Sequence, residues 1–243
     1  MTYCAGVMLD RGLVFMSDTR TNAGVDNVAV FRKMFHFETP GERAMTLMTA
    51  GNLATTQALI SLLEERSKAP AERNPSILEV PSMFQAARLV GSTLREVIRD
   101  YTDSGQEADN PFRASVILGG QIAGGAPRMF LIYPEGNFIE SAPETPYFQI
   151  GETKYGRPIL VRAHDPALSF EDTVKLLLVS FDSTIRANLS VDAPLDLHCY
   201  DSGSLRIGRT RRIERDDPYF REISEGWSEA LREAFRSLPP FRF

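Results

Sequence analysis

Cysteine, histidine and tryptophan are scarce in this 243-residue sequence, which has 2 cysteines, 3 histidines and 1 tryptophan. Cys4 and Cys199 are too few for a disulfide framework, and the first residues lack the basic start and long apolar centre of a secretion signal. We therefore expect a reduced, cytoplasmic chain. His36, His164 and His198 lack metal-ligand spacing with cysteines or acids, so we expect no metal.

Long apolar runs and a large excess of one charge are also missing. No apolar stretch is long enough to cross a bilayer, so no membrane partner is expected. The net charge of −5 is a mild acidity, which argues against nucleic-acid binding as the main activity. The composition is that of an ordinary globular protein, and the length fits a single domain over residues 1–243.

Strand-like and helix-like patterns occur in groups along the chain. Apolar and alternating runs predict strands at 2–9, 13–17, 31–37, 44–50, 114–122, 128–134, 137–141, 147–151, 195–200 and 205–214. Apolar stripes and capping residues predict helices at 53–65, 83–101, 154–163, 170–188 and from 217 onward, and a Pro-rich insertion at 67–81. This grouping differs from the alternating pattern of a parallel sheet. It predicts an α+β fold, a four-layer αββα sandwich of two antiparallel sheets flanked by helices.

A threonine follows the starting methionine, and this position can carry chemistry. If Met1 is removed, the α-amine of Thr2 becomes free, with an ordinary pKa of about 7.7–8.0. Such an amine can take the proton of the hydroxyl on its own residue and turn it into a nucleophile. Taken alone, Thr2 is better explained as an ordinary strand residue. Whether it is a nucleophile therefore depends on the residues of other segments.

Charged residues near the second and third predicted strands bear on that choice. Asp18 and Arg20 follow the second strand in SDTR, and Lys33 lies in FRKMF on the next strand. The alternation that buries Phe31 and Phe35 would turn Lys33 toward the same side. A buried lysine is costly to keep charged unless an acid pairs with it, so Asp18 is its predicted partner. The alternative is a surface turn and a lysine whose ammonium reaches solvent.

Gly51 ends a predicted strand and precedes a helix in Ala50-Gly51-Asn52. A backbone amide at a helix N-terminus can donate a hydrogen bond to an oxyanion, although a simple helix cap explains the same residues. Cys4 is a second candidate nucleophile, but a cysteine on a strand is more often a small buried hydrophobe.

Four stretches together resemble the proteasome β-type peptidases, which are N-terminal nucleophile (Ntn) hydrolases, and more narrowly the bacterial ancestral β-subunit group called Anbu. The stretches are TYCAGVMLDRGLVFMSDTRTNAGVDNVAVFRKM, MTAGNLATTQALI, FQIGETKYGRPIL and FDSTIRANLSVDAPLDL. The resemblance extends over nearly the whole chain. It implies a Thr-type hydrolase that cleaves amide bonds through an acyl-threonine ester.

The resemblance also implies roles for individual residues. Thr2 matches the nucleophile and its amine the general base, while Asp18 and Lys33 match the acid–lysine pair that tunes them. Arg20 matches a supporting arginine, and the Gly51 amide matches the oxyanion donor.

A substrate site is implied beside the nucleophile. It would be lined by Thr21, Phe31, Phe35, Thr49 and Leu53, with its aromatic residues making it apolar or shallow. The implied substrate is a peptide or a small amide, and no cofactor is implied. A homo-oligomer in the form of a ring or an open spiral is expected, while an ATPase partner stays open.

Two positions depart from the proteasome pattern. Ile150-Gly151-Glu152 stands where proteasome subunits have Gly-Ser-Gly, and ANLSVDAP stands at an auxiliary site with Asn188 near an expected Asp and Ser190 as a loose match. These departures leave two alternatives open. One is a non-proteolytic amidase on the same fold, and the other is a non-catalytic self-assembling module.

The C-terminal part has a basic run and an aromatic stripe. We expect the arginines of RIGRTRRIER (206–215) to lie on the solvent side of a strand or to pair with acids across a subunit boundary; nucleic-acid contact is the alternative. The last helix carries an apolar stripe that is most simply core. That stripe consists of Phe220, Ile223, Trp227, Leu231 and Phe235. The final PPFRF could pack on the domain or on a neighbour.

Overall fold

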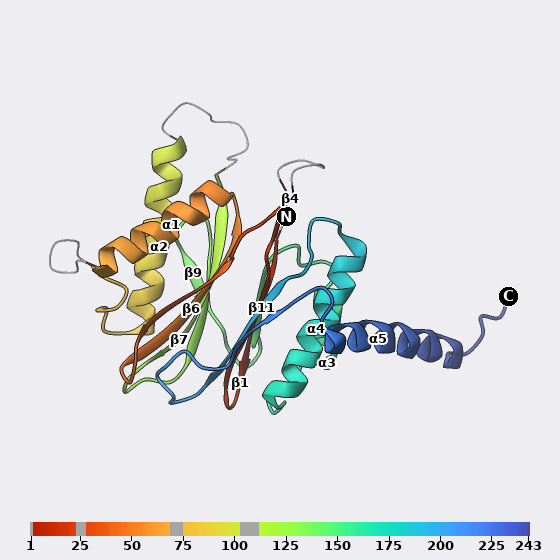
Figure 1. The fold of residues 1–243 in the computed structure, drawn as a ribbon. Coiled ribbons are helices and arrows are strands. Elements are labelled where there is room, and N and C mark those ends of the chain that lie inside the picture. Colours follow the sequence, from red (N-terminus) through yellow and green to blue (C-terminus); the bar gives the residue numbers. More distant parts are fainter. Residues whose placement is uncertain (1, 23–27, 69–74, 103–111) are drawn as a thin grey trace.

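Two antiparallel sheets form the centre of the computed structural model, which describes residues 2–22, 28–68, 75–102 and 112–243 (Figure 1). The first sheet has the order β10 (Tyr147–Gly151), β1 (Tyr3–Leu9), β2 (Gly12–Asp18), β11 (Leu195–Asp201) and β12 (Thr210–Ile213). The second has the order β5 (Met34–Thr39), β6 (Arg43–Gly51), β7 (Ala114–Ile122), β8 (Arg128–Ile132) and β9 (Phe138–Glu140).

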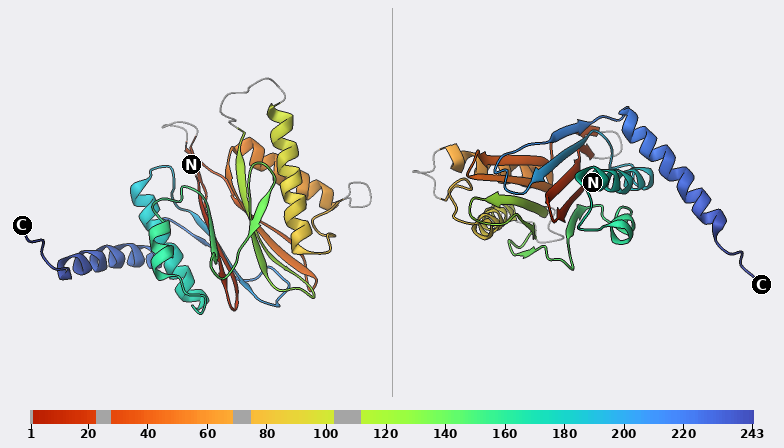
Figure 2. Two further views of the ribbon diagram at one scale, coloured as in Figure 1. Left: turned by 180° about the vertical axis from the view of Figure 1, so that it is seen from behind. Right: turned by 90° about the horizontal axis from the view of Figure 1, so that it is seen from below.

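Helices cover the outer face of each sheet. Helices α1 (Leu53–Lys68) and α2 (Met83–Thr102) lie on the second sheet, and α3 (Arg157–Ala163) and α4 (Phe170–Ala187) lie on the first (Figures 1 and 2). Two predicted caps are present, because Ser82 Oγ accepts from Gln85 N at 3.2 Å and Ser169 Oγ accepts from Asp172 N at 3.0 Å. The predicted four-layer αββα sandwich is confirmed.

Side-chain alternation along the strands explains the layered core. Successive residues of a strand face opposite sides of its sheet. In β1, Tyr3 therefore packs toward α3 and α4, whereas Cys4 packs between the two sheets. In β6, Leu47 packs toward α1 and α2, and Met48 packs between the sheets. The sheets thus share one buried layer, and strand ends from both sheets meet at its edge.

Several predicted boundaries are wrong. The strand predicted at 205–214 is reduced to β12, because Leu205 has a φ of 47° and lies in a turn where its N–H donates to the Tyr200 hydroxyl at 3.3 Å. The insertion predicted at 67–81 is partly core, since Ile77 and Val80 are buried under α1 and α2; its residues 69–74 lie outside the described part of the chain. The short ribbon of β3 (Arg20–Asn22) and β4 (Val28–Val30) was not predicted.

The prediction that the apolar stripe of the last helix is core holds for Phe220 and Ile223 and is wrong for the residues after them. In α5 (Pro218–Ser237) only Phe220 is buried, whereas Leu231 is 50% exposed and Phe235 is 76% exposed. The reason is geometric: α5 leaves the body of the protein after its first turns and projects outward (Figure 2). We call residues 231–243 the C-terminal arm. Phe241 and Phe243 at its end are exposed as well.

Four arginines of the basic run lie on the solvent side, as predicted, and pair with acids of the same chain and not across a subunit boundary. Arg209 pairs with Asp201, Arg211 with Asp217, Arg212 with Asp196 and Arg215 with Asp192. Among the described residues, no helix has the length and apolar character needed to cross a bilayer, and no three metal-binding side chains gather.

Candidate active site

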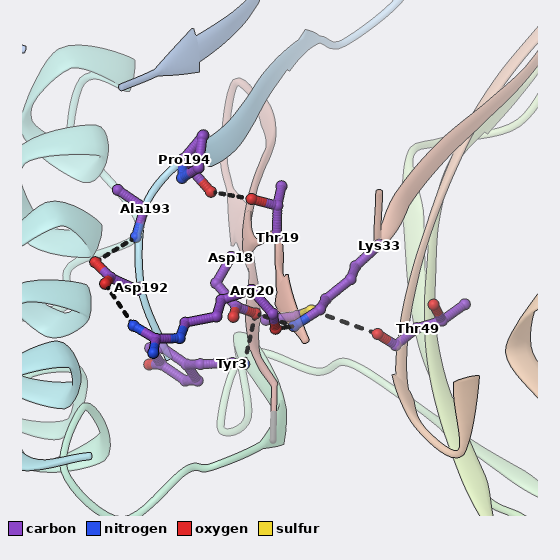
Figure 3. A network of polar contacts seen from close by, with 10 residues as sticks. Tyr3, Asp18, Thr19, Arg20, Lys33, Thr49, Asp192, Ala193 and Pro194 are labelled. Carbon is purple, nitrogen blue, oxygen red and sulfur yellow. Dashed lines mark hydrogen bonds and ion pairs between the residues drawn. The ribbon is translucent and has the colours of Figure 1, made fainter. Parts of the chain in front are cut away.

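A buried ion pair lies where the ends of three strands meet. Lys33 Nζ donates to Asp18 Oδ1 at 2.8 Å, and Tyr3 N donates to the same oxygen at 2.9 Å (Figure 3). Asp18 is 0% exposed and Lys33 is 5% exposed. Lys33 Nζ also donates to the carbonyl oxygen of Arg20 at 2.6 Å. The Asp18–Lys33 pair predicted from the sequence is therefore formed, one residue away from Thr2.

The reason first given for the direction of Lys33 is wrong. Lys33 precedes β5 instead of lying on a strand with Phe31 and Phe35. Phe35 packs toward the α1–α2 layer, whereas Lys33 reaches across to β2 in the other sheet. Its carbonyl accepts from Thr49 N at 2.9 Å, which anchors the backbone of this segment to β6.

Burial dominates the electrostatics of Asp18. Loss of hydration raises the pKa of Asp18 to about 6, although the Lys33 ammonium and the Tyr3 amide both act to lower it. Within the described part of the chain, Asp18 Oδ2 is buried and accepts no hydrogen bond. The Lys33 ammonium therefore favours the charged form of the Asp18 carboxylate. Asp18 Oδ2 is left as a hydrogen-bond acceptor beside the first strand.

Thr2 is held by its own backbone. It is 8% exposed, and its carbonyl oxygen accepts from Glu152 N at 2.6 Å. Gly151 has a φ of +84°, and a Cβ there would collide with the Thr2 carbonyl, so this position requires glycine. Thr2 is thus fixed between the end of β10 and the Asp18–Lys33 pair.

Gly51 lies at the end of β6, next to the start of α1. Its φ is +123°, and a Cβ there would collide with the carbonyl of Arg113, which explains the glycine. Asn52 Oδ1 accepts from Thr55 N at 3.1 Å and caps α1. Gly51 is two residues from Thr49, whose amide bonds to Lys33. The predicted oxyanion donor therefore lies on the strand end that anchors the lysine.

Arg20 supports the pair through its backbone. Its carbonyl accepts from Lys33, while its guanidinium Nη1 pairs with Asp192 Oδ2 at 2.9 Å (Figure 3). Thr19 Oγ1 next to it donates to the carbonyl of Pro194 at 2.8 Å. Asp192 was missed in the sequence, although it is the acid in the ANLSVDAP segment that was singled out as unusual.

The residues predicted for substrate binding lie on segments that meet at the pair. Phe31 N donates to Thr19 O at 2.8 Å, and Thr49 is buried next to Lys33. Thr21 on β3 and Leu53 at the start of α1 are both half-buried. Phe35 packs against the α1–α2 layer instead. A shared pocket of the other four residues stays a prediction.

Cys4 is a small buried residue of the core, which was the explanation preferred from the sequence. It is 0% exposed, and its Sγ donates to Thr49 O at 3.7 Å. Burial raises the pKa of the Cys4 thiol well above its ordinary value, which disfavours the reactive thiolate.

Two antiparallel sheets between helical layers, with Thr2 ahead of the first strand and Lys33 reaching across to β2, define the proteasome β-like fold of the Ntn hydrolases. No protein-family model matches this chain, and no curated protein sequence does. Solved structures do match. Over 100% of both chains, it is 46% identical to Anbu (ancestral beta-subunit) from Yersinia bercovieri, with a TM-score of 0.92.

Two further solved structures are similar to this chain over nearly its whole length. A (Gly-1) mutant of Anbu from Hyphomicrobium sp. strain MC1 is 47% identical over 100% of both chains, with a TM-score of 0.92. The Anbu of a helical assembly from Pseudomonas aeruginosa is 48% identical, with a TM-score of 0.91 over 99% of this chain and 98% of the other. This chain belongs to the Anbu family.

Proposed function

We propose that this protein is a threonine-type Ntn amide hydrolase, a peptidase whose nucleophile is Thr2 once Met1 has been removed. One observation carries the proposal: Tyr3 N and Lys33 Nζ share Asp18 Oδ1 at 2.9 and 2.8 Å, which places a buried ammonium–carboxylate pair one residue from Thr2. Such a pair is costly to bury, and buried ionisable groups with perturbed pKa values cluster at functional sites. The pair therefore supports chemistry at Thr2.

The proposed reaction begins with a proton transfer within one residue. The α-amine of Thr2 takes the proton of its Oγ, and Oγ attacks the carbonyl carbon of the substrate. The Lys33 ammonium stabilises the negative charge that develops on Oγ, and the Gly51 N–H donates to the oxyanion of the tetrahedral intermediate. The ammonium of Thr2 then protonates the leaving amine, and an acyl-Thr2 ester remains.

Water completes the cycle. The Thr2 amine, free base again, takes a proton from a water molecule that attacks the ester carbonyl. The C–O bond of the ester breaks, the proton returns to Oγ, and a carboxylic acid is released. In this scheme Thr21, Phe31, Thr49 and Leu53 bind the acyl side of the substrate, and the two apolar side chains favour an apolar group there.

The test combines mass spectrometry and labelling. The mass of the N-terminal peptide shows whether Thr2 is the first residue, and processed protein is then treated with fluorogenic peptides and with an epoxyketone or β-lactone probe. We expect a covalent adduct on Thr2. Processed protein that never forms this adduct contradicts the proposal.

A second candidate, a non-proteolytic amidase on the same fold, is favoured by Glu152. Its amide bonds to Thr2 O at 2.6 Å, so an acidic residue is the backbone neighbour of Thr2 at the position that departs from the proteasome pattern. A screen of small amides and isopeptide conjugates against peptides separates the two candidates. Turnover of peptides alone excludes the amidase.

We also propose that copies of the chain assemble through the C-terminal arm. The arm exposes Leu231, Phe235, Phe241 and Phe243, and a hollow of about 550 Å³ with an apolar lining lies beside it between α3, α4 and α5. Exposed apolar groups in such a row indicate a partner surface. A second copy is the proposed partner, since the related Pseudomonas aeruginosa protein forms a helical assembly. Light scattering tests it, and a cell phenotype that survives Thr2→Ala would favour a purely structural module.

A further inference from the structure

Glu152 is the residue next to Thr2 across the β1–β10 pair. Strands β1 and β10 are antiparallel, and the last residues in register are Tyr3 and Gly151. The hydrogen bond from Glu152 N to Thr2 O, at 2.6 Å, extends this register by one pair. The φ of +84° at Gly151 ends the regular strand there, so this bond places the backbone of Glu152 beside Thr2 where β10 stops. The carboxylate of Glu152 is therefore carried on the nearest cross-strand neighbour of Thr2.

Asn188 fixes that carboxylate in place. Asn188 Oδ1 accepts from Ser190 N at 2.9 Å, so its Nδ2 is the group that meets Glu152 Oε2, at 3.0 Å. The backbone of Asn188 is anchored as well, because its N–H donates to Thr184 O at 2.9 Å at the end of α4. A carboxylate that accepts a hydrogen bond from an anchored amide is held in one position.

We propose that Glu152 is a positioning residue for the α-amine of Thr2, which it orients as a hydrogen-bond acceptor and stabilises when that amine becomes an ammonium. The inference rests on the proposed function for its catalytic meaning, while the proximity of the two residues stands on the hydrogen bond from Glu152 N to Thr2 O. Asn188 holds Glu152 in the orientation that this contact requires.

The charges around the amine favour this role. Asp18 and Lys33 form one pair at 2.8 Å, and Arg20 is paired with Asp192 at 2.9 Å. Asp192 is also paired with Arg215, and Glu152 adds a half-buried acidic residue on the β10 side of Thr2. In the reaction, the proton of Oγ moves to the amine, and the new ammonium lies against this carboxylate. The proton then leaves with the departing amine, so Glu152 itself neither gains nor loses one.

The charge also sets the pKa of the amine. A carboxylate within about 4–6 Å favours the protonated amine and raises its pKa by about 1 unit or more, partly offset by the ammonium of Lys33. Replacing Glu152 with glutamine keeps the shape and the backbone N–H but removes the charge. The Thr2 amine should then titrate at lower pH.

The experiment measures that titration directly. Protein labelled with ¹⁵N-threonine, with Met1 shown by mass to be absent, is titrated by NMR at the Thr2 amine. Glu152→Gln is expected to lower the amine pKa by about 1 unit, and Asn188→Ala to lower it by less. The matched control is Glu144→Gln, which removes an exposed carboxylate away from Thr2 and should change nothing. An amine that titrates alike in wild type and Glu152→Gln overturns the inference.

Kinetics separates this inference from the proposed function. The rate of probe labelling is measured as a function of pH. In Glu152→Gln, the rise of this rate at acidic pH should shift down by about 1 pH unit, and the maximal rate should fall about tenfold. The melting temperature should not change. A Thr2 adduct without this shift removes the inference and keeps the hydrolase. A shifted amine pKa in a protein that forms no adduct keeps the contact and removes the hydrolase. Retention of Met1 removes both.

Discussion

The Asp18–Lys33 site and the C-terminal arm depart from the usual burial of side chains in opposite ways. At the site, a carboxylate and an ammonium are almost fully buried. In the arm, Phe235 and Phe241 are 76% and 80% exposed. Charged residues are rarely buried, and large apolar patches are rarely exposed, unless a function requires it. The comparison therefore separates a region that we propose for chemistry from a region that we propose for contact with other chains.

The two regions also differ in how they are supported. The site is braced by backbone hydrogen bonds from three strand ends, including those of Tyr3 and Thr49. The arm has no comparable support among the described residues, since α5 buries only Phe220 at its start. A change in the site should therefore affect rate and stability strongly, whereas a change in the arm should leave the fold intact and affect association.

The largest effect is expected from Thr2→Ala. Removing the hydroxyl removes the proposed nucleophile, and loss of such a group costs about 10⁴-fold or more in rate. Peptide turnover and probe labelling measure it, with Thr2→Ser as the control that keeps a hydroxyl. The arm is untouched, so light scattering should show the same assembly as wild type. Residual turnover within tenfold of wild type would place the chemistry elsewhere.

Breaking the pair from one side is expected to cost about 3–5 kcal/mol of unfolding free energy, because an uncompensated charge stays buried. Lys33→Met and Asp18→Asn should each show this loss in urea unfolding at pH 7. The double variant should recover much of it, since neither charge remains. Equal, additive losses in the double variant would show that the pair is not a coupled unit.

Stability should depend on pH through Asp18. Its folded pKa of about 6 is higher than the ordinary value of about 3.9, so the unfolded chain releases this proton first. Ionisation then works against the folded state, and the contribution of Asp18 to stability falls as pH rises from about 4 to about 6. Against the double variant Asp18→Asn/Lys33→Met, the difference in unfolding free energy should drop by up to about 3 kcal/mol across that window. A difference that stays flat with pH contradicts the raised pKa.

The sequence predicts the site better than the arm for a physical reason. Alternation and short turns fix the strands locally, so β7 (114–122) and β10 (147–151) have the predicted bounds. The Asp18–Lys33 pair follows from the cost of burying a lysine, but the strand alternation that predicted this burial was wrong, because Lys33 precedes β5. Asp192, however, lies 172 residues from its partner Arg20, and nothing in the local pattern links them.

The C-terminal arm shows what the sequence pattern does not predict. An apolar stripe at helical spacing predicts a buried face but does not tell what buries it. Here Phe220 packs on the body of the same chain, while Leu231 and Phe235 do not. The prediction of a core helix is wrong beyond the first turns, because an apolar stripe has the same pattern whether the fold of one chain or a contact with another chain buries it.

The smallest effect on the folded chain is expected in the arm. Phe235→Ser and Phe241→Ser, singly and together, should weaken association without lowering the melting temperature of the separated chain. Each phenylalanine buried in a contact contributes about 1.5–3 kcal/mol, or roughly a tenfold to hundredfold change in the dissociation constant. Analytical ultracentrifugation across a concentration series measures this change. The matched control is Arg242→Ser, which alters the same exposed tail without removing apolar surface. If the phenylalanine variants assemble like this control while Thr2 still reacts with the probe, the arm is not the contact, and the two regions differ in exposure alone.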